Sequence, residues 1–427
     1  MWFDPSRGRD ITTIVRSYHK DPEKLEKILE KYRVDVAPED AADKTFNLPA
    51  SLLPLGFNPI KDVQRFDWSP DDFLSSLNKK LYSQEMQAKI ARADFQFDIT
   101  GASIFIFHVF MMFFGVYYEI LPVWAFVILF VITRTSLTSV GHYHCHRKKD
   151  GISDWGDALF DMQYLGAHMV LFNVHSMLHH AYTNSSLDLE RAASTGMLQL
   201  PRLWRVPIYT LHRFGHLISG MLIRWIVAIK EFEYPTIKKF QFLFIRFLLV
   251  GELVFCLYTD NILLWSLQFV LTIWLNLFIV LSSHDFEESE TKSDLSHGQD
   301  WGIFQIKNSF DMKIIGIPYI DCFLTAGLGA HRAHHVLPAQ RSGLSNVVSE
   351  RALRETCKEF DVPWVKTKNF LLDRLPTLVS FYLFTPMESS HSDYKGFGGF
   401  LRETFSIEGL KRMIYSVYVG FKGIGSL

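Results

Sequence analysis

Cysteine is scarce and scattered in this sequence. Its four cysteines lie far apart and form no C-x-x-C pair, which argues against a disulfide framework or a zinc finger. An excess of charge of one sign is also absent, because 44 basic residues face 45 acidic ones. A nucleic-acid-binding protein is expected to carry a basic surface, so we expect no nucleic acid as a partner. The first thirty residues contain no continuous apolar core, and we therefore expect no cleavable signal peptide.

Long apolar runs, in contrast, are abundant in a chain that is 48% hydrophobic and 15% aromatic. A helix needs about 20 mostly apolar residues to cross the hydrocarbon of a bilayer. Segments that meet this requirement form two pairs with short connecting turns: Ile99–Tyr118 with Leu121–Ser139, and Phe240–Tyr258 with Ile262–Ser282. The sequence therefore predicts four transmembrane helices in two hairpins.

Basic residues flank the two predicted hairpins on one side, and the turns inside the hairpins contain neither Lys nor Arg. The flanking residues are Arg147, Lys148, Lys149, Lys238 and Lys239. The positive-inside tendency places these flanks in the cytosol. Two further apolar stretches, Ala158–Val174 and Gly215–Lys230, are predicted to lie at the membrane interface. Packing against the rest of the protein would explain the apolar face of the second stretch equally well.

The N-terminal region is predicted to form two short helices between Arg9 and Val34, then a linker that ends in an amphipathic helix near Leu74–Ala91. The string GRDITTIVRSYH resembles the second half of a cytochrome b5 domain, in which a histidine at the place of His19 is an axial haem ligand. The other ligand of that family lies in an upstream HPGG-type motif, which this chain begins too late to contain, so we expect no haem here. We divide the chain into a partial cytochrome b5-like segment (1–34), a linker with the amphipathic helix (35–98) and a membrane domain (99–427).

Histidines recur at helical spacing beside the ends of the predicted spans. In SVGHYHCHRKK, His142 and His146 are four residues apart and would share one helix face, whereas His144 would point away. A neutral imidazole offers one nitrogen lone pair to a transition metal. Histidines grouped in this way can therefore hold a redox-active ion.

Two more groups follow the same spacing. In NVHSMLHHAYTN, His175 and His179 are expected to share a face, and His180 is expected to offer a ligand to a neighbouring ion. The third group, in GAHRAHHVLP, forms one stripe of a predicted helix: His331, His334 and His335. Packed together without metal, these imidazoles would leave buried ring nitrogens in need of hydrogen-bond partners. His284 joins the predicted ligands because the topology places it at the same membrane face.

A single histidine on an apolar helix is more often a packed core residue than a ligand. We apply that interpretation to the remaining candidates: His108, His168, His212, His216, His297 and His391.

The arrangement HxxxH, HxxxHH and HxxHH around two hairpins resembles the membrane fatty acid desaturase family over about Phe97–Phe384, and the strings HHAYTN and DWGIFQIKNS support the resemblance. It implies an all-α integral membrane protein in which residues 99–427 form the desaturase domain, with a cytosolic helical cap that holds a di-iron site. The resemblance implies these ligands for two iron ions: His142, His146, His175, His179, His180, His284, His331, His334 and His335. Some members add an asparagine about one turn before the extra histidine, where this chain has Val280.

The function that the resemblance implies is dioxygen-dependent desaturation of a fatty acyl lipid, with iron cycling between Fe2+ and Fe3+. Electrons would come from cytochrome b5 and its reductase, and the protein would lie in the endoplasmic reticulum bilayer with its site facing the cytosol. Trp155 and Tyr164 are predicted to line an acyl tunnel. Acidic residues are expected to orient the ligand rings, or else to be ordinary solvated charges: Asp188, Glu190, Asp285 and Glu287.

Two other functions stay open at this point. A di-iron lipid hydroxylase would use the same ligands, and a non-enzymatic membrane metal carrier would also use H-x-x-x-H pairs, although with ligands near the middle of the bilayer. The sequence does not reveal the double-bond position, the acyl chain length or the acyl carrier. His331 stands where front-end desaturases typically carry Gln, which points away from that subgroup.

Overall fold

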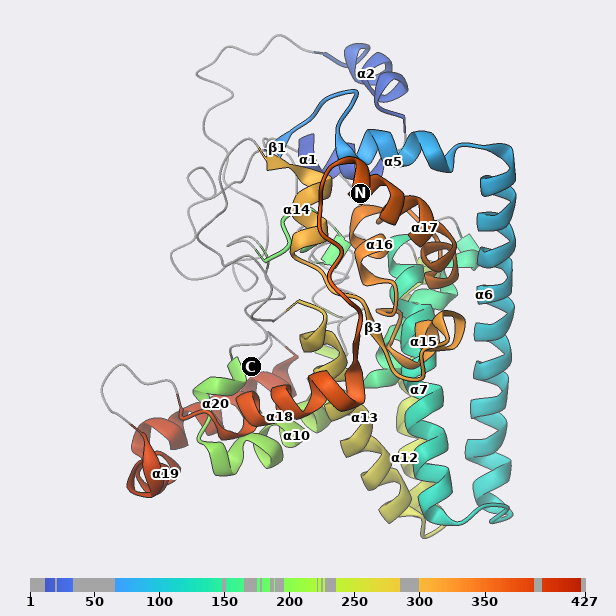
Figure 1. Ribbon diagram of the computed structural model, residues 1–427. Coiled ribbons are helices and arrows are strands. Elements are labelled where there is room, and N and C mark those ends of the chain that lie inside the picture. Colours follow the sequence, from blue (N-terminus) through green and yellow to red (C-terminus); the bar gives the residue numbers. More distant parts are fainter. Residues whose placement is uncertain are drawn as a thin grey trace.

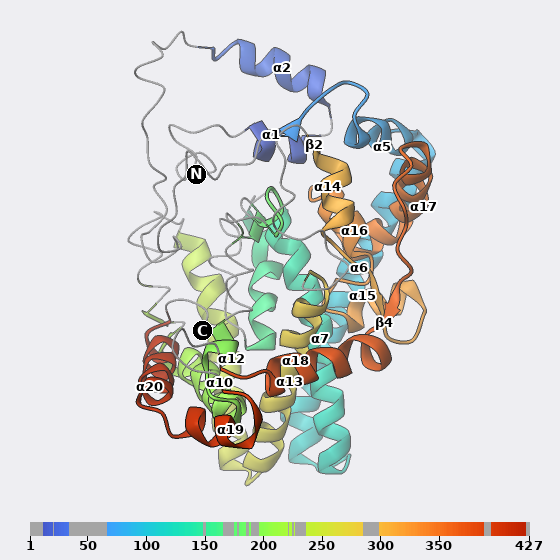
Figure 2. The same ribbon diagram turned by 60° about the vertical axis from the view of Figure 1, so that its left-hand side comes forward.

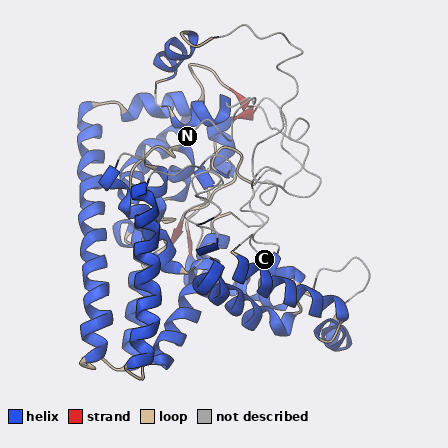
Figure 3. Cartoon of the chain, turned by 180° about the vertical axis from the view of Figure 1, so that it is seen from behind, coloured by secondary structure: helices blue, strands red, loops and turns tan. Residues whose placement is uncertain are grey.

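The computed structural model is built almost entirely of helices, and its few strands are two residues long (Figure 3). It describes residues 12–19, 21–33, 66–147, 151–164, 175–176, 179–184, 188, 196–220, 222–223, 226, 236–284, 299–387 and 394–423. All four cysteines lie within these ranges, and each is buried and forms no disulfide bond. The absence of a disulfide framework is therefore confirmed.

Two long helices, α6 and α7, run side by side (Figure 1). Helix α6 (Gln84–Phe110) continues as a π-helical stretch, η2 (Met111–Gly115), and α7 (Val123–His146) begins directly after Pro122. The chain reverses between them at Glu119, whose φ of 50° lies in the left-handed region. The predicted first span thus belongs to a longer helix, and the second span continues without a break to His146.

The prediction of one amphipathic helix over Leu74–Ala91 is wrong. The structure has a separate α5 (Phe73–Leu81), and α6 begins at Gln84. Ser83 is the reason, since its hydroxyl accepts the backbone N–H of Met86 (3.2 Å) and so starts a new helix. Because α6 runs across the predicted domain boundary between residues 98 and 99, no break in the helix marks that boundary.

The second pair of long helices consists of α12 (Thr236–Tyr258) and α13 (Ile262–Ser282), with Asp260 in the left-handed region (φ 57°) between them. By length and composition, the helices able to cross a membrane among the described residues are three: Gln84–Gly115, Val123–His146 and Ile262–Ser282. The remaining predicted span, within α12, stays a prediction.

Short helices surround the C-terminal end of α7 and the N-terminal half of α6 (Figure 1). We call them the upper helices: α5, α14 (Trp301–Lys307), α15 (Pro318–Leu324), α16 (His331–Val336) and α17 (Gly343–Glu359). Four of them share an apolar core with the N-terminal helix α1, built around Ile14, Phe73, Trp301 and Leu353. The N-terminal helices are α1 (Thr12–Tyr18) and α2 (Pro22–Glu30), as predicted.

Parallel pairing of short strands ties distant segments to the upper helices. The pairs are β1 (Phe66–Asp67) with β2 (Gln299–Asp300), and β3 (Met312–Lys313) with β4 (Lys368–Asn369). Asp300 adds a second tie, because its carboxylate accepts the backbone N–H of Phe73 (2.8 Å) at the start of α5. These contacts fix α5 and α14 relative to each other.

The other described elements pack beside the long helices or one another, and α10, α19 and α20 gather on one side (Figure 2). The remaining elements are η3 (Gly151–Gln163), η5 (Gly196–Gln199), η6 (Arg202–Trp204), α10 (Arg205–Gly215), η7 (His216–Gly220), η8 (Phe370–Arg374), α18 (Leu375–Phe384), α19 (Gly396–Thr404) and α20 (Ile407–Lys422). Two stretches are predicted at the membrane interface. The described part of Ala158–Val174 lies mostly in η3, which packs on α7. The described part of Gly215–Lys230 includes the π-helical η7. Their place in the membrane stays a prediction.

A charged cluster is buried between the long helices. The Arg134 guanidinium of α7 forms an ion pair with Glu252 of α12, and the Nε2 of His108 in α6 lies 3.3 Å from the second Glu252 oxygen. All three side chains are fully buried. The prediction that His108 is a packed core residue therefore holds, and we call this set the Arg–Glu–His triad. Similarly, the buried His212 ring bonds the Ser416 carbonyl (2.7 Å), whereas His168, His297 and His391 lie outside the described residues.

Candidate metal centre

The first histidine pair occupies the end of α7. His142 and His146 are one helical turn apart and both buried, with ring centroids 5.5 Å apart. His144, between them, points elsewhere, and its Nε2 lies 3.3 Å from the carboxylate of Asp98, which also pairs with Arg147 (2.6 Å). The predicted division, with the outer two histidines on one face and His144 away from it, is confirmed.

The second histidine group divides its ligands differently from the prediction. The rings of His175 and His179 do stack on one face, with centroids 5.1 Å apart, but it is the Nε2 of His180 that lies 3.1 Å from the Nε2 of His175. The Nε2 of His179 instead lies 3.0 Å from that of His284. The backbone explains the exchange, because the His180 N–H bonds the carbonyl of His175 (3.0 Å), five residues back. This wider π-type turn brings residue i+5 back toward residue i.

The third group lies on α16, whose three histidines are all buried. The Nε2 of His334 lies 3.1 Å from that of His142, and the His331 and His335 rings are 4.4 Å apart. Arg332 points away from this face and forms an ion pair with the buried Asp311 (3.2 Å). That ion pair anchors the helix, so the histidine stripe faces the first two groups.

Eight of the nine predicted ligands form two compact groups. In each group the candidate ligand atoms lie within 4.8 Å of one another. The groups are His142, His146, His175, His180 and His334, and His179, His284 and His335. The ninth, His331, borders the second group, with its ring 4.5 Å from His284 and 4.4 Å from His335. The tertiary structure thus gathers all nine imidazoles, from segments that are far apart in the chain.

The inner and outer ring nitrogens have different neighbours. Inner Nε2 atoms face one another, as in the 2.8 Å approach of His142 to His175. Some outer Nδ1 atoms face acceptors: the Nδ1 of His179 lies 2.9 Å from Asp188, and that of His284 lies 3.1 Å from the Asn308 carbonyl. An outer acceptor fixes the proton on Nδ1 and leaves the lone pair on Nε2, which is the usual arrangement around a metal-bound histidine.

Helix α14 supplies outer partners that sequence reasoning missed. The Gln305 amide oxygen lies 3.0 Å from the Nδ1 of His335, and its amide nitrogen donates to the carbonyl of His180 (2.9 Å). Thr183 donates to the same Gln305 oxygen (2.8 Å). The polar residues Gln305 and Asn308 stand within the string DWGIFQIKNS, so that string contained the signal. Among the acidic residues predicted for this role, Asp188 has it, whereas Glu190, Asp285 and Glu287 lie outside the described residues.

Burial favours the neutral form of three of these histidines. It lowers the pKa of His180, His334 and His335 well below the ordinary value, and the neighbouring imidazoles lower each pKa further. The buried Nε2 of His335 has no hydrogen-bond partner among the described residues. Neutral imidazoles with inward lone pairs fit a transition metal such as iron, zinc or copper, and the two groups contain no oxygen ligand among the described residues, which disfavours magnesium or calcium. The residues therefore fit two metal ions.

The predicted tunnel residues are only partly described. Tyr164 is buried, its hydroxyl accepts the amide of Gln268 (2.8 Å), and its ring lies 4.8 Å from that of Phe269. The side chain of Trp155 lies outside the described residues. A tunnel lined by these two residues stays a prediction.

The family model described as fatty acid desaturase matches residues 73–368, which is more than half of the 427-residue chain. The match includes the three histidine groups and His284, together with the α14 residues that contact them. Neither the curated proteins nor the solved structures contain a match.

Proposed function

The chain belongs to the fatty acid desaturase family, and from this premise we propose that it is a dioxygen-dependent desaturase that introduces a double bond into a fatty acyl lipid. Two hydrogen atoms leave adjacent carbons of the acyl chain. Together with two electrons from a donor and two protons, they reduce one dioxygen molecule to two water molecules.

The observation that carries the proposal is the paired histidine groups with inward Nε2 atoms. Bound iron would supply the dioxygen chemistry that an unactivated methylene demands, which no side-chain base can provide. The nine histidines would hold the two ions, and Asp188, Gln305 and the Asn308 carbonyl would keep individual rings in the ligating tautomer. The converging positions of the histidines and the donor chemistry of their Nε2 atoms support this proposed role as iron ligands.

The place of the site relative to the apolar helices supports an enzyme more than a metal carrier. His142 and His146 lie in the last turns of α7, and His284 follows the end of α13. A carrier is expected to place ligands near the middle of the bilayer. We propose four membrane-spanning helices, including α12, with the histidines at the cytosolic end of the spans.

The electron donor and the compartment follow from the same proposal. We infer that cytochrome b5 and its reductase deliver the electrons and that the protein lies in the endoplasmic reticulum membrane. A cytosolic site would be open to such a donor. The bilayer itself would deliver the acyl substrate.

Expression in a yeast that lacks its own desaturase tests the proposed reaction. Cells fed defined saturated fatty acids are expected to accumulate new double bonds, located by gas chromatography and mass spectrometry of each lipid class. The matched pair of variants is His334→Ala, which should abolish the product, and His144→Ala, which lies on the outer face of α7 and should retain it. New hydroxy-lipids without double bonds would establish the hydroxylase instead, and metal accumulation without altered lipids would establish a carrier.

A further inference from the structure

The N-terminal helix α1 reaches the metal centre through Tyr18. The Tyr18 hydroxyl donates to the carbonyl of Ser176 (2.9 Å) and lies 3.3 Å from the Nδ1 of His146. His146 belongs to the first histidine group, and Ser176 directly follows His175 of the second. One side chain from the N-terminal segment therefore contacts two of the segments that build the site.

The contact with the Ser176 carbonyl determines the direction of the hydrogen bonds at this hydroxyl. A phenol has one hydrogen, and a backbone carbonyl can only accept, so the Tyr18 hydrogen goes to Ser176. The Tyr18 oxygen can then only accept a hydrogen bond from His146. The Nδ1 of His146 must therefore carry a proton. A proton on Nδ1 leaves the lone pair of His146 on Nε2, which is the nitrogen available to a metal ion.

From this geometry we propose that Tyr18 is a positioning residue for the ligand His146, and that α1 is an integral part of the metal centre. The inference rests on the proposed di-iron function. It gives Tyr18 the role toward His146 that Asp188 has toward His179.

The packing of α1 supports a fixed role rather than an accidental contact. Thr13, Ile14 and Ser17 are buried, and Ile14 belongs to the apolar core of the upper helices. Arg16 forms an ion pair with Glu26 of α2 (2.6 Å). These contacts fix the end of α1 from which Tyr18 extends.

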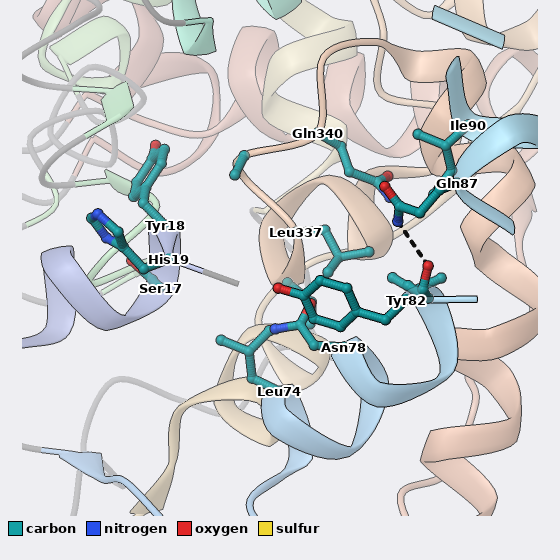
Figure 4. A pocket seen from close by; sticks show the side chains of 13 residues that line it. Ser17, Tyr18, His19, Leu74, Asn78, Tyr82, Gln87, Ile90, Leu337 and Gln340 are labelled. Carbon is teal, nitrogen blue, oxygen red and sulfur yellow. Dashed lines mark hydrogen bonds between the residues drawn. The ribbon is translucent and has the colours of Figure 1, made fainter. Parts of the chain in front are cut away.

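The neighbouring His19 does not share the contact that Tyr18 makes with the histidine groups. Figure 4 shows Tyr18 and His19 on one side of a pocket, and Asn78 of α5 and the following Tyr82 on the other. The His19 ring is exposed, and its Nδ1 lies 2.6 Å from the Val15 carbonyl of its own helix. That His19 binds no haem stays an expectation, whereas Tyr18 contacts the predicted ligand His146 directly.

The first experiment titrates metal-free full-length protein in detergent with Co2+, whose absorption spectrum reports imidazole coordination. The wild type is expected to bind two ions. Tyr18→Phe should bind one ion as tightly as the wild type and the other about 10–100-fold more weakly, because only the group that contains His146 is affected. Tyr32→Phe is the matched control, since Tyr32 lies in the same segment and is 76% exposed; its titration should equal that of the wild type.

The outcomes separate this inference from the function on which it rests. A wild type that takes up no Co2+ would overturn the proposed metal centre together with the role of Tyr18. Wild-type binding of two ions with an unchanged titration of Tyr18→Phe would overturn the role of Tyr18 alone.

A second experiment uses only the wild type and so decides the matter if Tyr18→Phe fails to fold. Coupling between a ligand and its positioning residue is reciprocal, so Co2+ should slow hydrogen–deuterium exchange in Thr12–Tyr18. Helix α20 serves as the reference and should not change. Equal exchange of Thr12–Tyr18 with and without bound Co2+ would contradict the proposal.

Discussion

Two buried polar clusters lie along α7, and they satisfy their polar atoms in opposite ways. In the Arg–Glu–His triad, a cation and an anion face each other, and His108 bonds both Glu252 (3.3 Å) and Thr133 (2.7 Å). In the metal centre, two turns further along the helix, neutral imidazoles face one another through their inner nitrogens. The triad balances its own charge, whereas the metal centre presents converging lone pairs that a cation would satisfy.

This comparison shows why burial of a histidine says little by itself. His108 and His334 are both buried next to an apolar helix, but only His334 has other imidazoles around it. The neighbours decide whether the ring is a structural hydrogen-bonding group or a metal ligand.

Removal of a central imidazole should have the largest effect and would sharpen the comparison most. His334 contacts His142 and lies 4.5 Å, ring to ring, from His180. We expect His334→Ala to lower bound iron and double-bond formation more than about 100-fold, since loss of outer partners alone costs about 10–100-fold. Iron analysis of purified protein and lipid analysis of expressing cells measure this. Retention of iron and activity would remove His334 from the site.

Breaking the Arg–Glu–His triad should lower the free energy of unfolding without changing the metal content of the folded protein. Glu252→Ala leaves Arg134 buried and unpaired, which is expected to cost about 3–5 kcal/mol of unfolding free energy. The double variant Arg134→Met with Glu252→Leu should cost less because no buried charge remains. Denaturant unfolding in detergent and the iron content of the folded fraction measure both effects. Loss of iron from well-folded Glu252→Ala would show that the two clusters are not independent.

Loss of an outer partner should weaken the metal centre without abolishing it. Asp188→Asn keeps the size of the side chain but removes the charge that faces the Nδ1 of His179. We expect metal affinity to fall about 10–100-fold, measured by competition with a chelator. An affinity equal to that of the wild type would return Asp188 to the class of ordinary structural charges.

The smallest expected effect, per residue, is on the pH dependence of the metal-free protein. Folding lowers the pKa of His331, His334 and His335, so below the ordinary histidine pKa of about 6.5 the unfolded chain binds more protons. Stability should therefore fall as the pH drops below about 6.5, by about 1.4 kcal/mol per pH unit for each such histidine. Denaturant unfolding between pH 5 and 8 measures the slope, and a flat profile would contradict neutral burial of these rings.

Local rules account for the parts of the molecule that sequence reasoning predicted well. The i, i+4 spacing of His142 and His146, with His144 opposite, is a property of one helix and appears unchanged in α7. The same reasoning missed the start of α6 at Ser83, where one side-chain hydrogen bond outweighs a continuous amphipathic pattern. It also exchanged the groups to which His179 and His180 belong, because spacing alone does not distinguish an α-helical turn from a π-type turn.

What the sequence by itself determined is the set of candidate donors: eight histidines at helical spacings and the single His284, beside apolar helices and in the pattern of one enzyme family. Only the tertiary structure decided which imidazoles share a group, how Gln305 and Asn308 face their outer nitrogens, and that Tyr18 reaches His146 across 128 residues of chain. The physical reason is that helical periodicity acts over a few residues. Convergence of distant side chains instead depends on how the upper helices pack on the end of α7.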